Sequence, residues 1–74
     1  MFGMIKIIKK NLKKESNPYY VVTRGGRRVE EKNYTDQTSA EIRAAKLVAM
    51  VQQYSPHERD SINIVYTSEP YKIR

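Results

Sequence analysis

Cysteine and tryptophan are absent from this chain, and histidine, phenylalanine, glycine and proline are scarce. Without cysteine the chain has neither a disulfide framework nor a thiolate zinc site. Its single histidine, His57, cannot form a histidine-based metal site alone. The length of 74 residues is below the size at which a single core gives comfortable stability. We therefore expect one small domain over residues 1–74, with no metal and no cofactor.

Long apolar runs are also missing from the chain. No segment approaches the roughly 20 apolar residues that are needed to span a bilayer. The first residues, MFGMIKIIKKNLKK, carry their charges after the apolar side chains, which is the opposite of the order in a secretory signal. The sequence therefore predicts a cytoplasmic protein with no membrane partner.

Acidic residues are scarce in the first half of the chain, where most basic residues lie. The net charge is +6, and residues 34–74 hold five side chains of each sign. Residues 1–33 hold only Glu15, Glu30 and Glu31 against nine basic side chains: Lys6, Lys9, Lys10, Lys13, Lys14, Arg24, Arg27, Arg28 and Lys32. This excess favours a polyanionic partner, because phosphates release counterions when cations bind them. A lysine-rich sheet edge that resists aggregation is the alternative explanation.

The apolar pattern predicts three strands before a helix. Met4–Lys10 alternates loosely between apolar and basic residues. Tyr19–Arg24 is rich in aromatic and β-branched residues and is the clearest strand. Gly25 and Gly26 predict a type I′ hairpin turn, because both central positions of that turn need positive φ. The returning strand, Arg27–Tyr34, is polar and is expected at a sheet edge or on a face that a partner uses.

A helix is predicted from Ala40 to about Tyr54. Thr38 and Glu41 have the spacing of a capping box, in which each side chain satisfies a free amide of the other. Ser55-Pro56 ends the helix. Apolar residues recur at helical spacing and form one stripe, which consists of Ala44, Leu47, Val48, Val51 and Tyr54.

The last predicted strand, Ser61–Thr67, has apolar residues on both faces. Ile62, Ile64 and Tyr66 share one face. Val65 lies on the other face, which indicates a more interior strand than Arg27–Tyr34. The predicted fold is α+β with the order β-β-β-α-β. It consists of a three-stranded antiparallel meander, one helix, and a fourth strand that a right-handed crossover brings alongside the first.

Two motifs of the second half stand in a recognisable order. Thr35 to Glu41 is followed by Ala44-Ala45, and the last strand ends in Thr67-Ser68-Glu69. The chain resembles a ribonuclease H-like domain, in which a Thr-rich entry and a Glu-x-x-Ala-Ala helix precede a strand that ends in Thr-Asp-Ser. The resemblance covers residues about 4–71 and implies the front half of the family's fold.

The resemblance also implies an activity, two-metal hydrolysis by three clustered carboxylates. The strand that would supply the first acid reads Ile5-Lys6-Ile7-Ile8-Lys9-Lys10, and Ser68 stands where the family has its third acid. Glu41 remains, and its capping-box spacing accounts for it without a metal. We therefore expect a truncated, catalytically degenerate form of the family that is not an enzyme.

Basic residues flank the predicted turn and follow the first strand. Seven of them are predicted to contact nucleic-acid phosphates: Lys9, Lys10, Lys13, Lys14, Arg24, Arg27 and Arg28. The expected function is that of a small, non-catalytic protein that binds DNA or RNA through a basic hairpin. The other hypothesis is an accessory or inhibitor factor, of phage or plasmid type, that binds an acidic surface of a host protein. A homodimer joined through an unpaired edge strand is compatible with either function.

Overall fold

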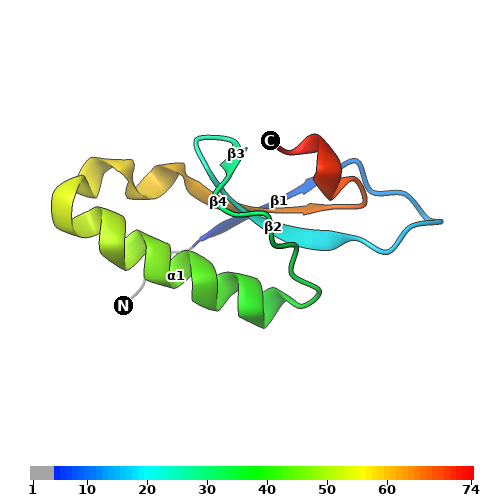
Figure 1. The fold of residues 1–74 in the computed structure, drawn as a ribbon, viewed down its shortest axis with the longest axis horizontal. Coiled ribbons are helices and arrows are strands. Elements are labelled where there is room, and N and C mark those ends of the chain that lie inside the picture. The colour runs from blue at the N-terminus through cyan, green and yellow to red at the C-terminus, as the bar shows by residue number, and fades with distance from the viewer. Residues whose placement is uncertain (1–4) are drawn as a thin grey trace.

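The computed structural model describes residues 5–74, apart from the side chains of Arg59 and Asp60. A four-stranded sheet is covered on one face by α1 (Gln37–Tyr54) and partly on the other by the short 3-10 turn η2 (Pro70–Lys72) (Figure 1). The strands are β1 (Lys6–Lys10), β2 (Tyr19–Arg24), β3 (Arg27–Arg28) and β4 (Ile62–Thr67), and the 3-10 segment η1 (Pro56–Ser61) joins α1 to β4. The predicted α+β class is confirmed, while Met4 of the predicted first strand lies outside the described residues.

The strand order is β1-β4-β2-β3, which corrects the predicted meander. β4 pairs in parallel with β1 and antiparallel with β2, so it separates two strands that a meander places side by side. The predicted position of the last strand beside the first is confirmed. Two features explain the order. β4 is apolar on both faces and is best buried at the centre, and the connection 11–18 is longer than a usual hairpin loop of about 2–5 residues.

The turn between β2 and β3 has the predicted form. Gly25 and Gly26 have φ values of 60° and 82°, the positive values that a type I′ turn needs. Arg24 pairs with Arg27 across the turn. The local sequence is therefore sufficient to specify this hairpin.

β3 ends at Arg28, whereas the sequence predicts a strand that continues to Tyr34. A regular continuation of the hairpin places residue 31 opposite Tyr20, but Tyr34 lies there instead, with N–H to O=C hydrogen bonds of 2.8 Å in both directions. The segment 30–33 therefore bulges out of the ladder. The bulged segment contacts α1, because Glu30 Oε1 accepts a hydrogen bond of 2.8 Å from Arg43 Nε.

α1 begins earlier than the sequence predicts, and a different residue caps it. Asp36 is the N-cap, and its carboxylate accepts a hydrogen bond of 2.9 Å from the Ser39 N–H. The predicted capping box of Thr38 and Glu41 is therefore wrong. Aspartate is a better N-cap residue than threonine, which accounts for the earlier start. The predicted end of the helix at Tyr54 is confirmed.

The core lies between α1 and one face of the sheet. Its buried residues are Val22, Tyr34, Ile62 and Ile64 on the side of the sheet, and Ala40, Ala44, Leu47 and Val51 on the helix. Val48 packs against this cluster, as the helical stripe predicts. Tyr54 does not belong to the core, since it is 58% exposed and its hydroxyl accepts a hydrogen bond from Arg24.

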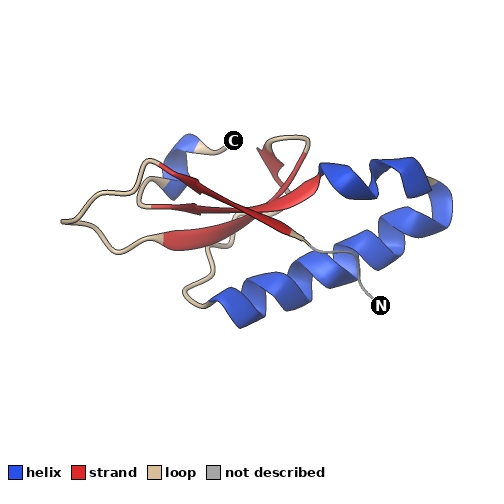
Figure 2. Cartoon of the chain, turned by 180° about the vertical axis from the view of Figure 1, so that it is seen from behind, coloured by secondary structure: helices blue, strands red, loops and turns tan. Residues whose placement is uncertain are grey.

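The opposite face of the sheet has a smaller buried patch. Val21 and Val65 are buried without belonging to the core cluster, which confirms that Val65 faces away from Ile62 and Ile64. η2 packs against β2 on this side, and Pro70 is buried there. Figure 2 shows α1 along one side of the strands and η2 on the other. Within residues 5–74, no helix has the length and apolar character needed to cross a membrane.

Candidate nucleic-acid interface

The seven basic residues predicted to bind phosphates do not form one surface. The lysines lie in and after β1, the arginines lie at the turn that follows β2, and both strands pair with β4. Lys10 lies beside Thr67, the last residue of β4, whereas Arg24 lies beside Ile62, the first. At about 3.3 Å per residue, the two ends of β4 are roughly 16 Å apart. β1 and β2 also lie on opposite sides of β4. The lysines and the arginines therefore form two separate groups.

Arg24 joins β2 to the C-terminal end of α1 and to η1. Its Nη2 lies 2.9 Å from Glu58 Oε2, and its Nη1 donates a hydrogen bond of 3.3 Å to the Tyr54 hydroxyl. Arg27, by contrast, is exposed and makes no ion pair or side-chain hydrogen bond with any residue that the structure describes. The positive charge that remains at the turn is mainly that of Arg27.

Arg28 holds the C-terminal segment against the sheet. Its Nε donates a hydrogen bond of 2.8 Å to the Ile73 carbonyl, and its Nη2 donates one of 2.5 Å to the Pro70 carbonyl. Its backbone N–H donates to the Arg74 carbonyl at 3.3 Å. A guanidinium held by carbonyl groups in this way has a structural role. The turn thus presents one freely accessible arginine, not the three that the sequence predicts.

The lysines of β1 are exposed along an edge strand. Lys6, Lys9 and Lys10 are exposed, and so is Lys14 in the connection that follows. Among the side chains that the structure describes, none of these four forms an ion pair or a side-chain hydrogen bond with another. Lys9 lies in a cross-strand row with Tyr66 on the helix side, whereas Lys6 and Lys10 lie on the other face. Lys6 was missed by the sequence prediction, although it belongs to the same alternating pattern.

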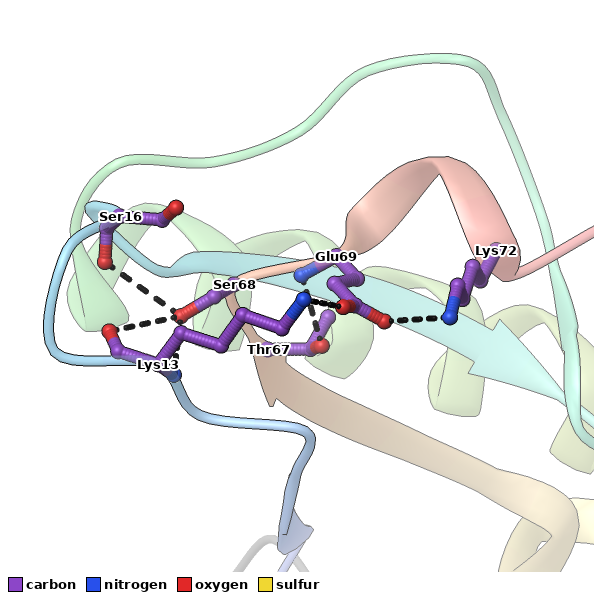
Figure 3. A network of polar contacts seen from close by, with 6 residues as sticks. All are labelled: Lys13, Ser16, Thr67, Ser68, Glu69 and Lys72. Carbon is purple, nitrogen blue, oxygen red and sulfur yellow. Dashed lines mark hydrogen bonds and ion pairs between the residues drawn. The ribbon is translucent and has the colours of Figure 1, made fainter.

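Lys13 and Lys72 form ion pairs with the same carboxylate (Figure 3). Lys13 Nζ lies 2.5 Å from Glu69 Oε1, and Lys72 Nζ lies 2.8 Å from Glu69 Oε2. The Glu69 side chain is only 6% exposed, while those of the two lysines are 61% and 59% exposed. Sequence reasoning missed Lys72, although its i,i+3 spacing to Glu69 was a visible signal.

Ser68 stands at the position where the ribonuclease H-like resemblance implies a metal-binding aspartate. Its hydroxyl accepts a hydrogen bond of 3.0 Å from the Lys13 N–H and donates to the Ser16 carbonyl at 3.4 Å. It therefore ties the connection 11–18 to the end of β4. Glu41 is exposed on α1, and the described residues contain no group of three or more carboxylate, imidazole or thiol side chains that could hold a metal. The resemblance and the lack of catalysis both stay predictions.

Three carboxyl groups of the structure have lowered pKa values. Hydrogen bonds to the charged form cause each lowering: Lys13 and Lys72 lower the pKa of Glu69, Tyr34 and Arg43 lower that of Glu30, and Ser39 lowers that of Asp36. The hydrogen bonds with Glu69 in turn raise the pKa of Lys13 and of Lys72. The folded state thus favours the ionised form of all three carboxyl groups.

Stability is expected to fall when the solution becomes acidic. A carboxyl group with a lowered folded-state pKa stabilises the fold above its unfolded value of about 4, and the effect disappears as pH falls through the folded pKa. The free energy of unfolding in urea should be nearly constant between about pH 5.5 and 7 and should decline below about pH 4.5. Glu69→Gln should make this decline shallower. A profile that is flat down to about pH 3 would contradict the expectation.

The basic side chains that stay exposed and unpaired among those the structure describes are the lysines at β1, with Arg27 as a separate point of positive charge. Arg24 and Arg28 are engaged within the fold, and Lys13 shares Glu69 with Lys72.

Comparisons with protein-family models, with curated proteins and with solved structures find no match to this chain.

Proposed function

We propose that the protein is a small, non-catalytic nucleic-acid-binding protein that contacts phosphates through the β1 edge. The observation that carries this proposal is the exposure of Lys6, Lys9, Lys10 and Lys14 without a partner among the described side chains. Ammonium groups that no carboxylate neutralises bind phosphates by displacing counterions, and this requires no base-specific geometry. The formal net charge of +6 supports the same class of partner.

The position of β1 in the sheet suits phosphate binding. Among the described strands only β4 pairs with β1, so β1 forms one edge of the sheet. Its side chains alternate between the two faces, and the lysines therefore project on both sides of that edge. A nucleic-acid backbone that runs along the edge meets several ammonium groups in succession. The same lysines also protect the edge from aggregation, and the two roles are compatible.

The test compares two variants of equal net charge. Lys9→Gln/Lys10→Gln removes charge from β1, and Lys32→Gln/Lys46→Gln removes the same charge from exposed positions elsewhere. Binding to labelled DNA and RNA oligonucleotides is followed by fluorescence anisotropy between about 50 and 200 mM NaCl. The β1 variant should lose two phosphate contacts, which reduces the slope of log K against log salt by about 1.4–1.8. The control variant should keep a slope close to that of the wild type.

Two outcomes would count against the proposal. If the wild-type protein binds no oligonucleotide at about 50 mM NaCl, nucleic-acid binding itself is refuted. If both variants lose the same affinity and slope, the protein responds only to total charge, and the assignment of the interface to β1 is wrong.

An acidic protein segment is the second candidate partner, and the open edge of β1 is the observation that favours it. The outer backbone groups of an edge strand accept an added strand from a partner. Antiparallel pairing of β1 with a second copy about Ile8 places Lys6 opposite Lys10, and like charges in that position are destabilising. An acidic strand therefore suits this edge better than a second copy. Pulldown of tagged protein with and without nuclease treatment distinguishes a protein partner from nucleic acid.

A further inference from the structure

The carboxylate that Lys13 and Lys72 share is buried behind the two lysines. Glu69 is 6% exposed, whereas the lysine side chains are 61% and 59% exposed (Figure 3). One carboxylate between two ammonium groups leaves a net charge of about +1 at this site, and each ammonium has three N–H donors, of which Glu69 uses one. An anion that approaches from solvent therefore meets two ammonium groups with free donors, while the negative charge lies underneath.

Glu69 also fixes where the two ammonium groups lie. Lysine loses considerable rotamer freedom when it binds a ligand, and a lysine already held by an ion pair has lost part of that freedom in advance. The carboxylate is itself part of an ordered end of β4, since the Glu69 N–H donates a hydrogen bond of 3.0 Å to Thr67 Oγ1. The neighbouring Ser68 hydroxyl accepts a hydrogen bond from the Lys13 N–H. The arrangement is therefore preorganised for a single anionic group.

Tyr71 precedes Lys72 in the chain and, at 71%, is the most exposed of the large hydrophobic side chains that the structure describes. It belongs to η2, which is closed by hydrogen bonds of 3.1 Å from Lys72 N–H to the Glu69 carbonyl and from Ile73 N–H to the Pro70 carbonyl. Arg28 also holds this turn through the Ile73 and Pro70 carbonyls. A well-anchored turn thus presents to solvent an aromatic ring and, at the next residue, one of the two lysines.

From this juxtaposition we infer that Lys13, Lys72 and Tyr71 form a subsite for one nucleotide of a single-stranded nucleic acid. The lysines bind the phosphate and the tyrosine ring stacks on the base. The bases of a duplex are already stacked on each other, so only a single strand offers a free base to an aromatic side chain. This inference rests on the proposed function and deepens it, because it names single-stranded nucleic acid as the ligand class.

The subsite is continuous with the proposed interface along β1. Lys10, at the end of β1, lies beside Thr67, and Glu69 follows two residues later in the chain. The connection that begins after Lys10 carries Lys13 to Glu69. A single-stranded nucleic acid bound along the β1 lysines therefore reaches Lys13 at the same end of the sheet, whereas Arg27 lies at the other end.

The test uses substitutions of Tyr71 in the full chain. Binding to a labelled single-stranded thymidine oligonucleotide and to a duplex, each of about 20 nucleotides per strand, is measured at about 50 mM NaCl. Tyr71→Ala should weaken single-strand binding by about 5- to 150-fold, the range seen when a stacking aromatic is removed. Tyr71→Phe, which retains the ring, should bind within about twofold of the wild type. Duplex binding should change little in either variant.

Two further variants control for the lysines and for loss of a tyrosine as such. Lys72→Gln should remove about one phosphate contact, which reduces the slope of log K against log salt for single-strand binding by about 0.7. Tyr54→Ala removes another exposed tyrosine, at the opposite end of the sheet, and should leave single-strand affinity unchanged. Thermal melting of each variant verifies that it is folded.

The outcomes separate this inference from the proposed function. If Tyr71→Ala binds the single strand as well as the wild type while Lys9→Gln/Lys10→Gln loses affinity, the subsite is refuted and the β1 interface stands. If the wild type prefers the duplex, the assignment of the ligand class is refuted. If it binds neither oligonucleotide, both proposals fail.

Discussion

We expect the Ile64→Ala variant to lose about 2–5 kcal/mol of unfolding free energy, the usual cost of truncating a fully buried isoleucine. Ile64 has no exposed surface and lies in the middle of β4, one of the two inner strands of the sheet. It stands between Ile7 of β1 and Val22 of β2 in the same cross-strand row. A cavity at this position therefore affects three strands and the helix that covers them.

The loss should be measured by urea unfolding followed by far-ultraviolet circular dichroism. A single core in a domain of this size supplies about 3–5 kcal/mol, so a large fraction of the variant should be unfolded without denaturant at room temperature. Ile42→Ala is the matched control. Ile42 is 53% exposed, and its truncation should change stability by no more than about 0.5 kcal/mol. A loss below about 1 kcal/mol for Ile64→Ala would contradict its central position.

The second large effect is expected at Arg28. Arg28→Ala removes the guanidinium hydrogen bonds to the Ile73 and Pro70 carbonyls and should cost about 2–3 kcal/mol, because hydrogen bonds from charged donors are stronger than neutral ones. Without them the C-terminal segment loses its main attachment to β3. Val21, which lies on the face that η2 covers, should then become accessible to solvent.

The neighbouring arginine provides the control for this prediction. Arg27→Ala removes the same chemical group one residue earlier, at an exposed position, and should change the unfolding free energy by less than about 0.5 kcal/mol. Arg28→Lys should restore little stability, since a single ammonium lacks the forked geometry with which a guanidinium reaches two carbonyls. Hydrogen exchange of the amides in residues 70–74 should accelerate in Arg28→Ala and not in Arg27→Ala. Equal effects of the two alanine variants would show that Arg28 has no structural role.

Much of the local structure follows from short stretches of sequence. The bounds of β2 match the prediction because aromatic and β-branched residues precede a Gly-Gly turn, a combination that strongly indicates a hairpin. The end of α1 matches because proline follows closely. The N-terminus of α1 differs from the prediction because Asp36 and Thr38 are both acceptable caps. The spacing of Thr38 and Glu41 predicts a capping box at Thr38, whereas Asp36 caps the helix.

The order of the strands is not visible in local patterns. A meander and the observed order both place β4 beside β1, and both leave β3 at an edge. What decides between them is whether β2 pairs with β1 or with β4. That choice depends on burying β4 on both sides, which is a property of the whole sheet and not of any one segment.

The contacts of the basic residues in the candidate site are likewise not visible in local sequence patterns. The sequence identifies basic residues, yet it does not reveal which of them have partners. Glu58 is 34 residues from Arg24, and Glu69 is farther still from Lys13, so these pairs exist only once the fold is formed. The resemblance drew attention to Ser68-Glu69 as a degenerate metal site. In the structure, Glu69 instead arranges two lysines, a function for which no short motif exists.

The position of β4 has a consequence for how the chain folds. Lys6 pairs with Asn63, so the parallel β1–β4 ladder joins residues almost at opposite ends of the sequence, and closing so long a loop slows folding. β1 and β2 have no direct ladder with each other among the described strands, and both depend on β4 as their common neighbour. During synthesis on a ribosome, the hairpin and the helix are therefore able to form early. The sheet itself assembles only after residues 62–67 have emerged.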